Sequence, residues 1–116
     1  MWFMVALVLT GALSILNSIA LQEFLYWKYE WFDVFMHFLG GMSIAAFVGA
    51  ILVTKKPSLF FGLSLVAFIA WEVFEYFNGI PREANYVFDT SLDLVMDMLG
   101  ATFVFILMRR TLWRSV

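Results

Sequence analysis

Four long apolar stretches are the feature that most constrains what this chain can fold into. A helix needs about 20 mostly apolar residues to cross the hydrocarbon layer of a membrane. The stretches reach roughly that length, and none alternates between polar and apolar residues as a membrane β-barrel strand does. The sequence therefore predicts an all-α integral membrane bundle of four transmembrane helices, over approximately residues 1–22, 34–54, 57–77 and 91–109.

The composition also indicates a membrane location. Hydrophobic residues make up 64% of the 116 residues and charged residues 14%, against about 45–50% and about 25% in soluble domains. A small domain leaves much of its surface exposed, so the apolar excess must face lipid. We therefore expect a single transmembrane helical domain over residues 1–116 with membrane lipids as its partners, and exclude a soluble enzyme. The net charge of −2 excludes a nucleic-acid partner, and the lack of cysteine excludes thiol chemistry.

Two of the four stretches have features that are unusual for a membrane-spanning helix. The first contains Ser18-Ile19-Ala20, which has the form of a signal-peptide cleavage site. It lacks a basic segment at its start and its apolar run is too long for a signal peptide, so we expect a retained helix. The last stretch is interrupted by Asp93 and Asp97 but contains no proline, and we interpret it as a helix as well.

The polar connections predict an interfacial segment and an orientation. Residues 23–33 mix charges with aromatic residues, which is typical of a short amphipathic segment at the membrane interface. Basic residues follow the second and fourth stretches, at Lys55, Lys56, Arg109, Arg110 and Arg114. Four spans place both groups on the side of the N-terminus, and the positive-inside rule makes that side cytoplasmic. We expect the plasma (inner) membrane, with both termini in the cytoplasm.

All nine acidic residues fall toward the opposite side of the membrane. At 1.5 Å per residue, three of the predicted helices place ionisable groups in one layer, about 18–29 Å from the basic residues. Within each helix these groups are three or four positions apart and share a face. They are Asp33, His37, Glu72, Glu75, Asp93 and Asp97.

Ionisable groups inside a membrane cost at least a few kcal/mol each, so they turn toward partners or water. Carboxylates that face one another repel, and a bound cation or shared protons relieve the repulsion. Carboxylates with one imidazole suit Zn²⁺, Mn²⁺, Mg²⁺, Ca²⁺ or Fe²⁺. The sequence therefore predicts an outward-facing divalent-metal site formed by all six of these residues.

Several functions fit such a site. A metal-dependent hydrolase would act on an envelope lipid or a lipid-linked phosphate, with His37 or Glu75 as the base. A cation or proton translocator would use the acids as a relay. In a non-catalytic envelope protein the acids would be structural, solvated at the helix ends. The sequence leaves open whether any reaction is catalysed, and a single histidine argues against a di-iron bundle, which uses two.

Small residues repeat along one face of the second predicted helix, at Gly41, Ala45 and Gly49. Such a stripe lets a helix backbone approach its neighbour closely. It predicts either tight packing within the chain or a homodimer contact.

Three motifs follow one another along residues 33–101: Asp33-x-x-x-His37-Phe38-x-Gly40-Gly41, Glu72-x-x-Glu75, and Asp89-x-x-x-Asp93-x-x-x-Asp97-x-x-Gly100. Their order resembles the VanZ-like and YjdF-like small integral membrane proteins, in which Asn is common at the place of Asp97. The resemblance implies a polytopic helical protein, with links to glycopeptide (teicoplanin) resistance in the VanZ-like branch. It implies no particular reaction.

Overall fold

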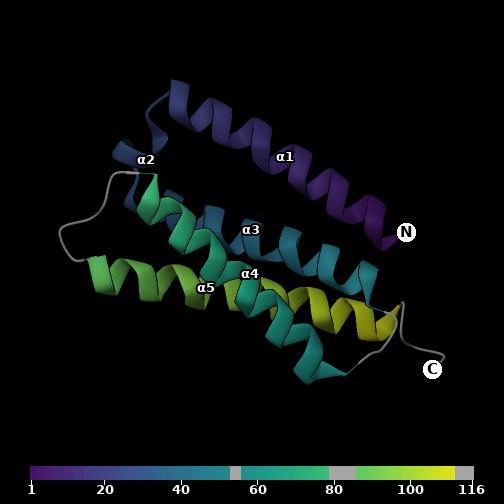
Figure 1. Cartoon of the computed structure of the whole chain (residues 1–116). Helices are drawn as coiled ribbons and strands as arrows, with labels where there is room; N and C mark the ends of the chain where they lie inside the picture. Colours follow the sequence, from purple (N-terminus) through teal and green to yellow (C-terminus); the bar gives the residue numbers. More distant parts are fainter. Residues whose placement is uncertain (53–55, 79–85, 112–116) are drawn as a thin grey trace.

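The chain forms a bundle of long helices in the computed structural model, which describes residues 1–52, 56–78 and 86–111 (Figure 1). The helices are α1 (Trp2–Gln22), α2 (Leu25–Lys28), α3 (Glu30–Ile51), α4 (Pro57–Phe77) and α5 (Tyr86–Arg110). Within these ranges there is no strand, and α1, α3, α4 and α5 are each long and apolar enough to cross a membrane. The prediction of an all-α membrane bundle with four spanning helices is confirmed.

The helix boundaries differ from the predicted ones in α3 and α5. Helix α3 runs from Glu30 to Ile51 rather than from residue 34 to residue 54, and α5 begins at Tyr86 rather than at residue 91. The first turns therefore include Asp33 and Asp89, which the sequence assigned to connections. Acidic side chains are favoured in the first turn because they interact with the positive end of the helix dipole. Helix α4 covers the predicted range, and Pro57 stands at its first position, where a missing N–H costs nothing.

The short helix α2 lies between the first two spans, where the sequence predicts an interfacial segment. The chain turns into it at Phe24, whose φ of 57° lies in the left-handed region that is uncommon for a residue with a side chain. Tyr26 then donates a hydrogen bond to Asn17 Oδ1 (2.6 Å) and packs edge-on against Phe32, with ring centroids 5.0 Å apart. These contacts attach α2 to both α1 and α3.

Helix α3 is the central element, since it contacts α1, α4 and α5. Its side chains share a core with α1, α4 and α5 that includes Ala45, Ala46, Phe60, Phe68, Ala101, Val104 and Met108. Many large apolar side chains on the outer faces are exposed, such as Val8, Ile15 and Val66. Apolar surface of that extent is expected where a helix faces lipid.

Helices α3 and α5 pack closely against each other where they cross. A Cβ atom added to Gly41 would lie 2.7 Å from the Cα of Asp97, and one added to Gly100 would lie 2.8 Å from the backbone N of Met42. Both are closer than real Cβ atoms approach their neighbours, so glycine is required on each side of this crossing. Only small residues allow helix backbones to meet in this way.

The small-residue stripe of α3 packs within the chain, which is one of its two interpretations. Gly41, Ala45 and Gly49 are all buried, and a Cβ atom on Gly49 would collide with the side chain of Met108 on α5. A homodimer through this stripe stays a prediction. Because the three residues are buried within one chain, their contacts do not support such a dimer.

Candidate metal centre

The start of α3, the end of α4 and the start of α5 meet at one end of the bundle, beside α2 (Figure 1). All six side chains predicted to form a site belong to these three helices. Asp33 and His37 come from α3, the two glutamates from α4, and Asp93 and Asp97 from α5, where Asp97 stands near the middle of the helix. The structure therefore brings together the residues that sequence spacing placed in one layer.

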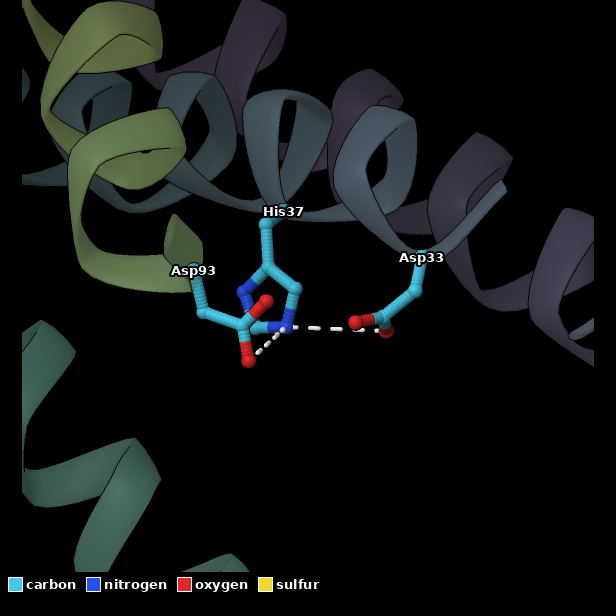
Figure 2. A group of neighbouring side chains, drawn as sticks. All are labelled: Asp33, His37 and Asp93. Atoms are coloured by element: carbon cyan, nitrogen blue, oxygen red, sulfur yellow. Dashed lines mark ion pairs between the residues drawn. The ribbon is translucent and has the colours of Figure 1, made fainter. Parts of the chain in front are cut away.

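His37 is at the centre of the group. Its Nδ1 atom lies 3.2 Å from Asp97 Oδ1, and its Nε2 atom lies 3.2 Å from Asp93 Oδ2. Asp33 approaches Nε2 from one turn earlier on the same helix, at 3.7 Å. Figure 2 shows the Nε2 side of the ring between the carboxylates of Asp33 and Asp93. Both ring nitrogens thus face carboxylates.

Burial differs sharply across this group. The His37 side chain is 10% exposed, and those of Asp93 and Asp97 are 5% and 6% exposed. Asp33 is 41% exposed and forms part of the rim. His37, Asp93 and Asp97 are thus the buried part of the centre, and Asp33 is its most exposed member among these four.

The glycine crossing explains why α5 approaches the imidazole so closely. Gly41 is one turn after His37 on α3, and its missing side chain makes room for the backbone of Asp97 on α5. Gly100 stands three residues after Asp97 and lies against the backbone of α3 at Phe38. Two glycines that face each other across the crossing therefore set the distance between the ring and the α5 aspartates.

Helix α4 contributes two further carboxylates. Potential ligand atoms of Glu72, His37 and Asp97 all lie within 4.8 Å of one another, as do those of Glu72, Glu75 and Asp93. Glu72 is buried. Glu75 is half-buried and accepts a hydrogen bond from Trp71 Nε1 (2.8 Å).

Two buried carboxylate oxygens of the centre have no partner within the part of the chain that the structure describes. Glu72 Oε1 and Asp93 Oδ1 are fully buried and make no hydrogen bond with any residue that the structure describes. An unsatisfied buried polar group costs about 1–3 kcal/mol, and more when it is charged. Native structures tolerate such a cost where an unseen water, ion or proton completes the group.

Two aromatic residues at the rim were not singled out by the sequence. Burial and the charges of Asp33 and Glu75 raise the pKa of Tyr26, on α2, to about 12, so its phenol stays neutral. Trp71 bonds to Glu75, which its spacing of four residues on one helix could have indicated. Nothing in the sequence pointed to Tyr26, because its position depends on how α2 folds back. Of the remaining acids, Glu23 and Glu30 are exposed, Asp89 is half-buried in the first turn of α5, and Glu83 lies outside the described residues.

Beyond the centre, toward the other end of the bundle, the interior formed by the described residues is almost wholly apolar. Phe68 is one turn before Glu72 on α4, and Ala101 is one turn after Asp97 on α5, and both are completely buried. The buried polar side chains at this depth are Ser43, which bonds to Thr10 (2.6 Å), and Ser64. Among the described residues, no chain of ionisable groups continues from the centre toward the other end of the bundle.

The fold and this end of the bundle define a small multi-pass helical membrane protein with a buried acid–histidine centre. Residues 1–114 match the family of predicted membrane proteins DUF2238, and the chain belongs to that family. The match supports a small membrane protein and does not select the VanZ-like or YjdF-like proteins in particular. A search of curated proteins and a search of solved structures each found no match.

Proposed function

We propose that this protein binds a divalent metal ion in the centre formed by Asp33, His37, Glu72, Glu75, Asp93 and Asp97. The observation that carries the proposal is the pair of buried, unpartnered oxygens on Glu72 and Asp93. They lie among further carboxylates, where a water could donate to them but could not offset the negative charge. A divalent cation supplies the missing partner and reduces the repulsion between the carboxylates.

The donor set defines the candidate ions. Carboxylate oxygens accept Mg²⁺, Ca²⁺ and Mn²⁺, and an imidazole extends the set to Zn²⁺ and Fe²⁺. A histidine that binds a metal usually donates its other ring N–H to a carboxylate, which fixes the orientation of the ring. Asp97, 3.2 Å from His37 Nδ1, is placed to act as that carboxylate. Elemental analysis of the purified protein identifies the metal.

Elemental analysis of the protein purified without chelator tests the proposal. We expect at least one divalent ion per chain. Asp97→Asn weakens the orientation of His37 and should lower the metal affinity about 10–100-fold. Glu23→Gln, which alters an exposed acid outside the centre, should leave the metal content unchanged. A wild-type protein that contains no metal and takes up none on dialysis against Mn²⁺, Zn²⁺ or Ca²⁺ would contradict the proposal.

The proposal includes a location for the centre. The basic residues Lys56, Arg109 and Arg110 stand at the opposite ends of their helices from the acids. The positive-inside rule then places both termini in the cytoplasm and the centre on the outer side of the plasma (inner) membrane.

Labelling of single cysteines in intact cells measures this orientation. A cysteine introduced at position 83 should react with a reagent that does not cross the membrane, and one at position 114 should be protected. The reverse pattern would put the acid–histidine centre on the cytoplasmic side.

The catalytic form of the proposal is a metal-dependent hydrolase of an envelope lipid or a lipid-linked phosphate. A divalent ion held by these residues would lower the pKa of a water ligand and so supply a nucleophile near neutral pH. Attack of that water on phosphorus would break the ester P–O bond. A base would take the proton from the water and return it to the leaving oxygen. The candidate bases are His37 and Glu75, and the one that is not bound to the ion would act; Glu75, which is half-buried, is the more accessible.

Two other functions are less well supported. A cation or proton translocator needs a polar path, and the described interior below the centre is apolar, with Phe68 and Ala101 directly beneath the acids. A non-catalytic envelope protein of the VanZ-like resistance type is compatible with the fold, but gives no reason for two unpartnered buried oxygens. Metal binding accounts for them.

A further inference from the structure

We propose that the centre holds two divalent ions rather than one, with Asp93 as the ligand that bridges them. The first ion lies among Asp33, His37 and Asp93, and the second among Glu72, Glu75 and Asp93. This inference rests on the proposed metal binding and adds the number of ions, their ligands and the class of substrate.

Two separate triads of ligands are already assembled. In each, one potential ligand atom per residue lies within 4.8 Å of the other two, which is close enough for one ion to reach all three. The first triad joins α3 to α5, as Figure 2 shows, and the second joins α4 to α5. Asp93 is the one residue that they share.

The two oxygens of Asp93 have different surroundings. Oδ2 lies 3.2 Å from His37 Nε2, on the side of the first triad. Oδ1 is fully buried and has no hydrogen-bond partner among the residues that the structure describes, and Glu72 Oε1, of the second triad, is in the same condition. A bridging carboxylate gives one oxygen to each ion, so with Oδ2 beside His37, Oδ1 is the oxygen that Asp93 would give to the second ion.

His37 can bind only one of the two ions. A neutral imidazole has one nitrogen with a free lone pair, while the other carries a proton. With Nδ1 donating to Asp97, Nε2 is left for the first ion, beside Asp33 and Asp93. A third grouping, of His37, Glu72 and Asp97, would need the same ring, so Asp97 is assigned as the positioning residue and Glu72 as a ligand of the second ion.

The charge balance also favours two ions. Five of the six residues at the centre are carboxylic acids, and the sixth is a histidine, whose imidazole must be neutral to bind a metal. With all five carboxylates ionised, one divalent ion would leave three uncompensated negative charges among largely buried side chains, whereas two ions would leave one. Repulsion among carboxylates in such a place is what bound cations relieve.

Two ions define a substrate class. Metal pairs about 3.5–4 Å apart stabilise both the attacking and the leaving oxygen in the displacement at a phosphate group. A phosphate ester is therefore the ligand that this centre would take. The first site, with its imidazole, suits Zn²⁺, Fe²⁺ or Mn²⁺, and the all-oxygen second site suits Mn²⁺, Mg²⁺ or Ca²⁺. Mn²⁺ suits both and is the probe of choice.

The test is a Mn²⁺ titration of the full chain in detergent, after removal of bound metal, with free Mn²⁺ measured by electron paramagnetic resonance. We expect two Mn²⁺ per wild-type chain, with a spin-coupled signal at saturation. Glu75→Gln should remove the second ion and Asp33→Asn the first, so that each binds one Mn²⁺ without coupling. Glu23→Gln, the control, should bind two.

The outcomes separate this inference from the proposed function. A single Mn²⁺ per wild-type chain would overturn the two-ion centre and leave metal binding intact, whereas no bound Mn²⁺, Zn²⁺ or Ca²⁺ would overturn both. Two ions in Glu75→Gln or in Asp33→Asn would overturn the ligand assignment. Circular dichroism shows whether each variant is folded, and if one is not, the wild-type stoichiometry still decides.

Discussion

Replacing Gly41 with alanine should lower the free energy of unfolding by about 1–3 kcal/mol, and replacing it with leucine should prevent assembly of the native bundle. The added Cβ atom would meet the backbone of Asp97, 2.7 Å from its Cα, and a backbone cannot turn aside as a flexible side chain can. Helices α3 and α5 would have to separate. Thermal melting and gel filtration in detergent measure the effect.

Other glycines of the same chain provide matched controls. Gly40 is the neighbour of Gly41 on α3, and a Cβ atom there would lie 3.9 Å from Leu13 Cδ2, an ordinary contact. Gly62, on α4, has open space around it. Alanine at either position should be neutral, or stabilising by up to about 1 kcal/mol, because alanine favours a helix more than glycine does. Native melting of Gly41→Leu would show that the α3–α5 crossing is wrong.

The same crossing sets the geometry of the metal centre. Gly100→Ala should therefore reduce metal affinity as well as stability, since its Cβ atom would press against α3 and shift Asp93 and Asp97 relative to His37.

The four spanning helices could be predicted because a membrane leaves few alternatives for a long apolar stretch. Their N-termini could not be placed as well. Glu30 and Asp33 look like connecting residues when charge alone is considered, but the first turn of α3 accepts them. Helix α5 likewise begins before Asp89. A charged residue near a helix end can belong to the connection before the helix or to the first turn of the helix. The local sequence does not distinguish these two positions.

The layer of the candidate site could be predicted, because spacing along a helix fixes height and face. Contacts between helices could not. That Asp93 and Asp97 meet the His37 ring, one at each nitrogen, follows from how closely α3 and α5 pack. The stripe that includes Gly41 indicated a close neighbour without naming it, and the facing Gly100 becomes apparent only once the helices are in place. The position of Tyr26 at the rim likewise depends on the turn at Phe24.

Divalent cations should raise the melting temperature of the protein, and EDTA should lower it. A ligand that binds only the folded state stabilises it by about 2.7 kcal/mol at a free concentration of 100 times its dissociation constant. Mn²⁺, Zn²⁺ and Ca²⁺ are the ions to compare. His37→Ala, Glu72→Ala and Asp97→Ala should each reduce the shift, because each removes a ligand or the partner that orients one.

The effect should depend on pH in a defined direction. Carboxylates and imidazole bind metal only when deprotonated, so protons compete with the ion and the metal-induced shift should disappear as the pH falls below about 5. Glu23→Ala changes an exposed acid outside the centre, and Glu83→Ala changes an acid that is not one of the six proposed site residues; both variants should keep the full shift at pH 7.

The metal hypothesis would be wrong if no divalent ion shifted the melting temperature. The variants His37→Ala, Glu72→Ala and Asp97→Ala would then respond to metal no differently from the wild type. The buried oxygens of Glu72 and Asp93 would then need protons as their partners, because carboxylates this close cannot all remain ionised without compensation. A protonated His37 between Asp93 and Asp97 would supply part of that compensation. Such a cluster should instead lose stability as the pH rises and the shared protons leave, the opposite of the direction expected for a metal site. The pH dependence of the melt in the presence of saturating metal therefore distinguishes the two, because a metal site gains stability as the pH rises and a proton-sharing cluster loses it.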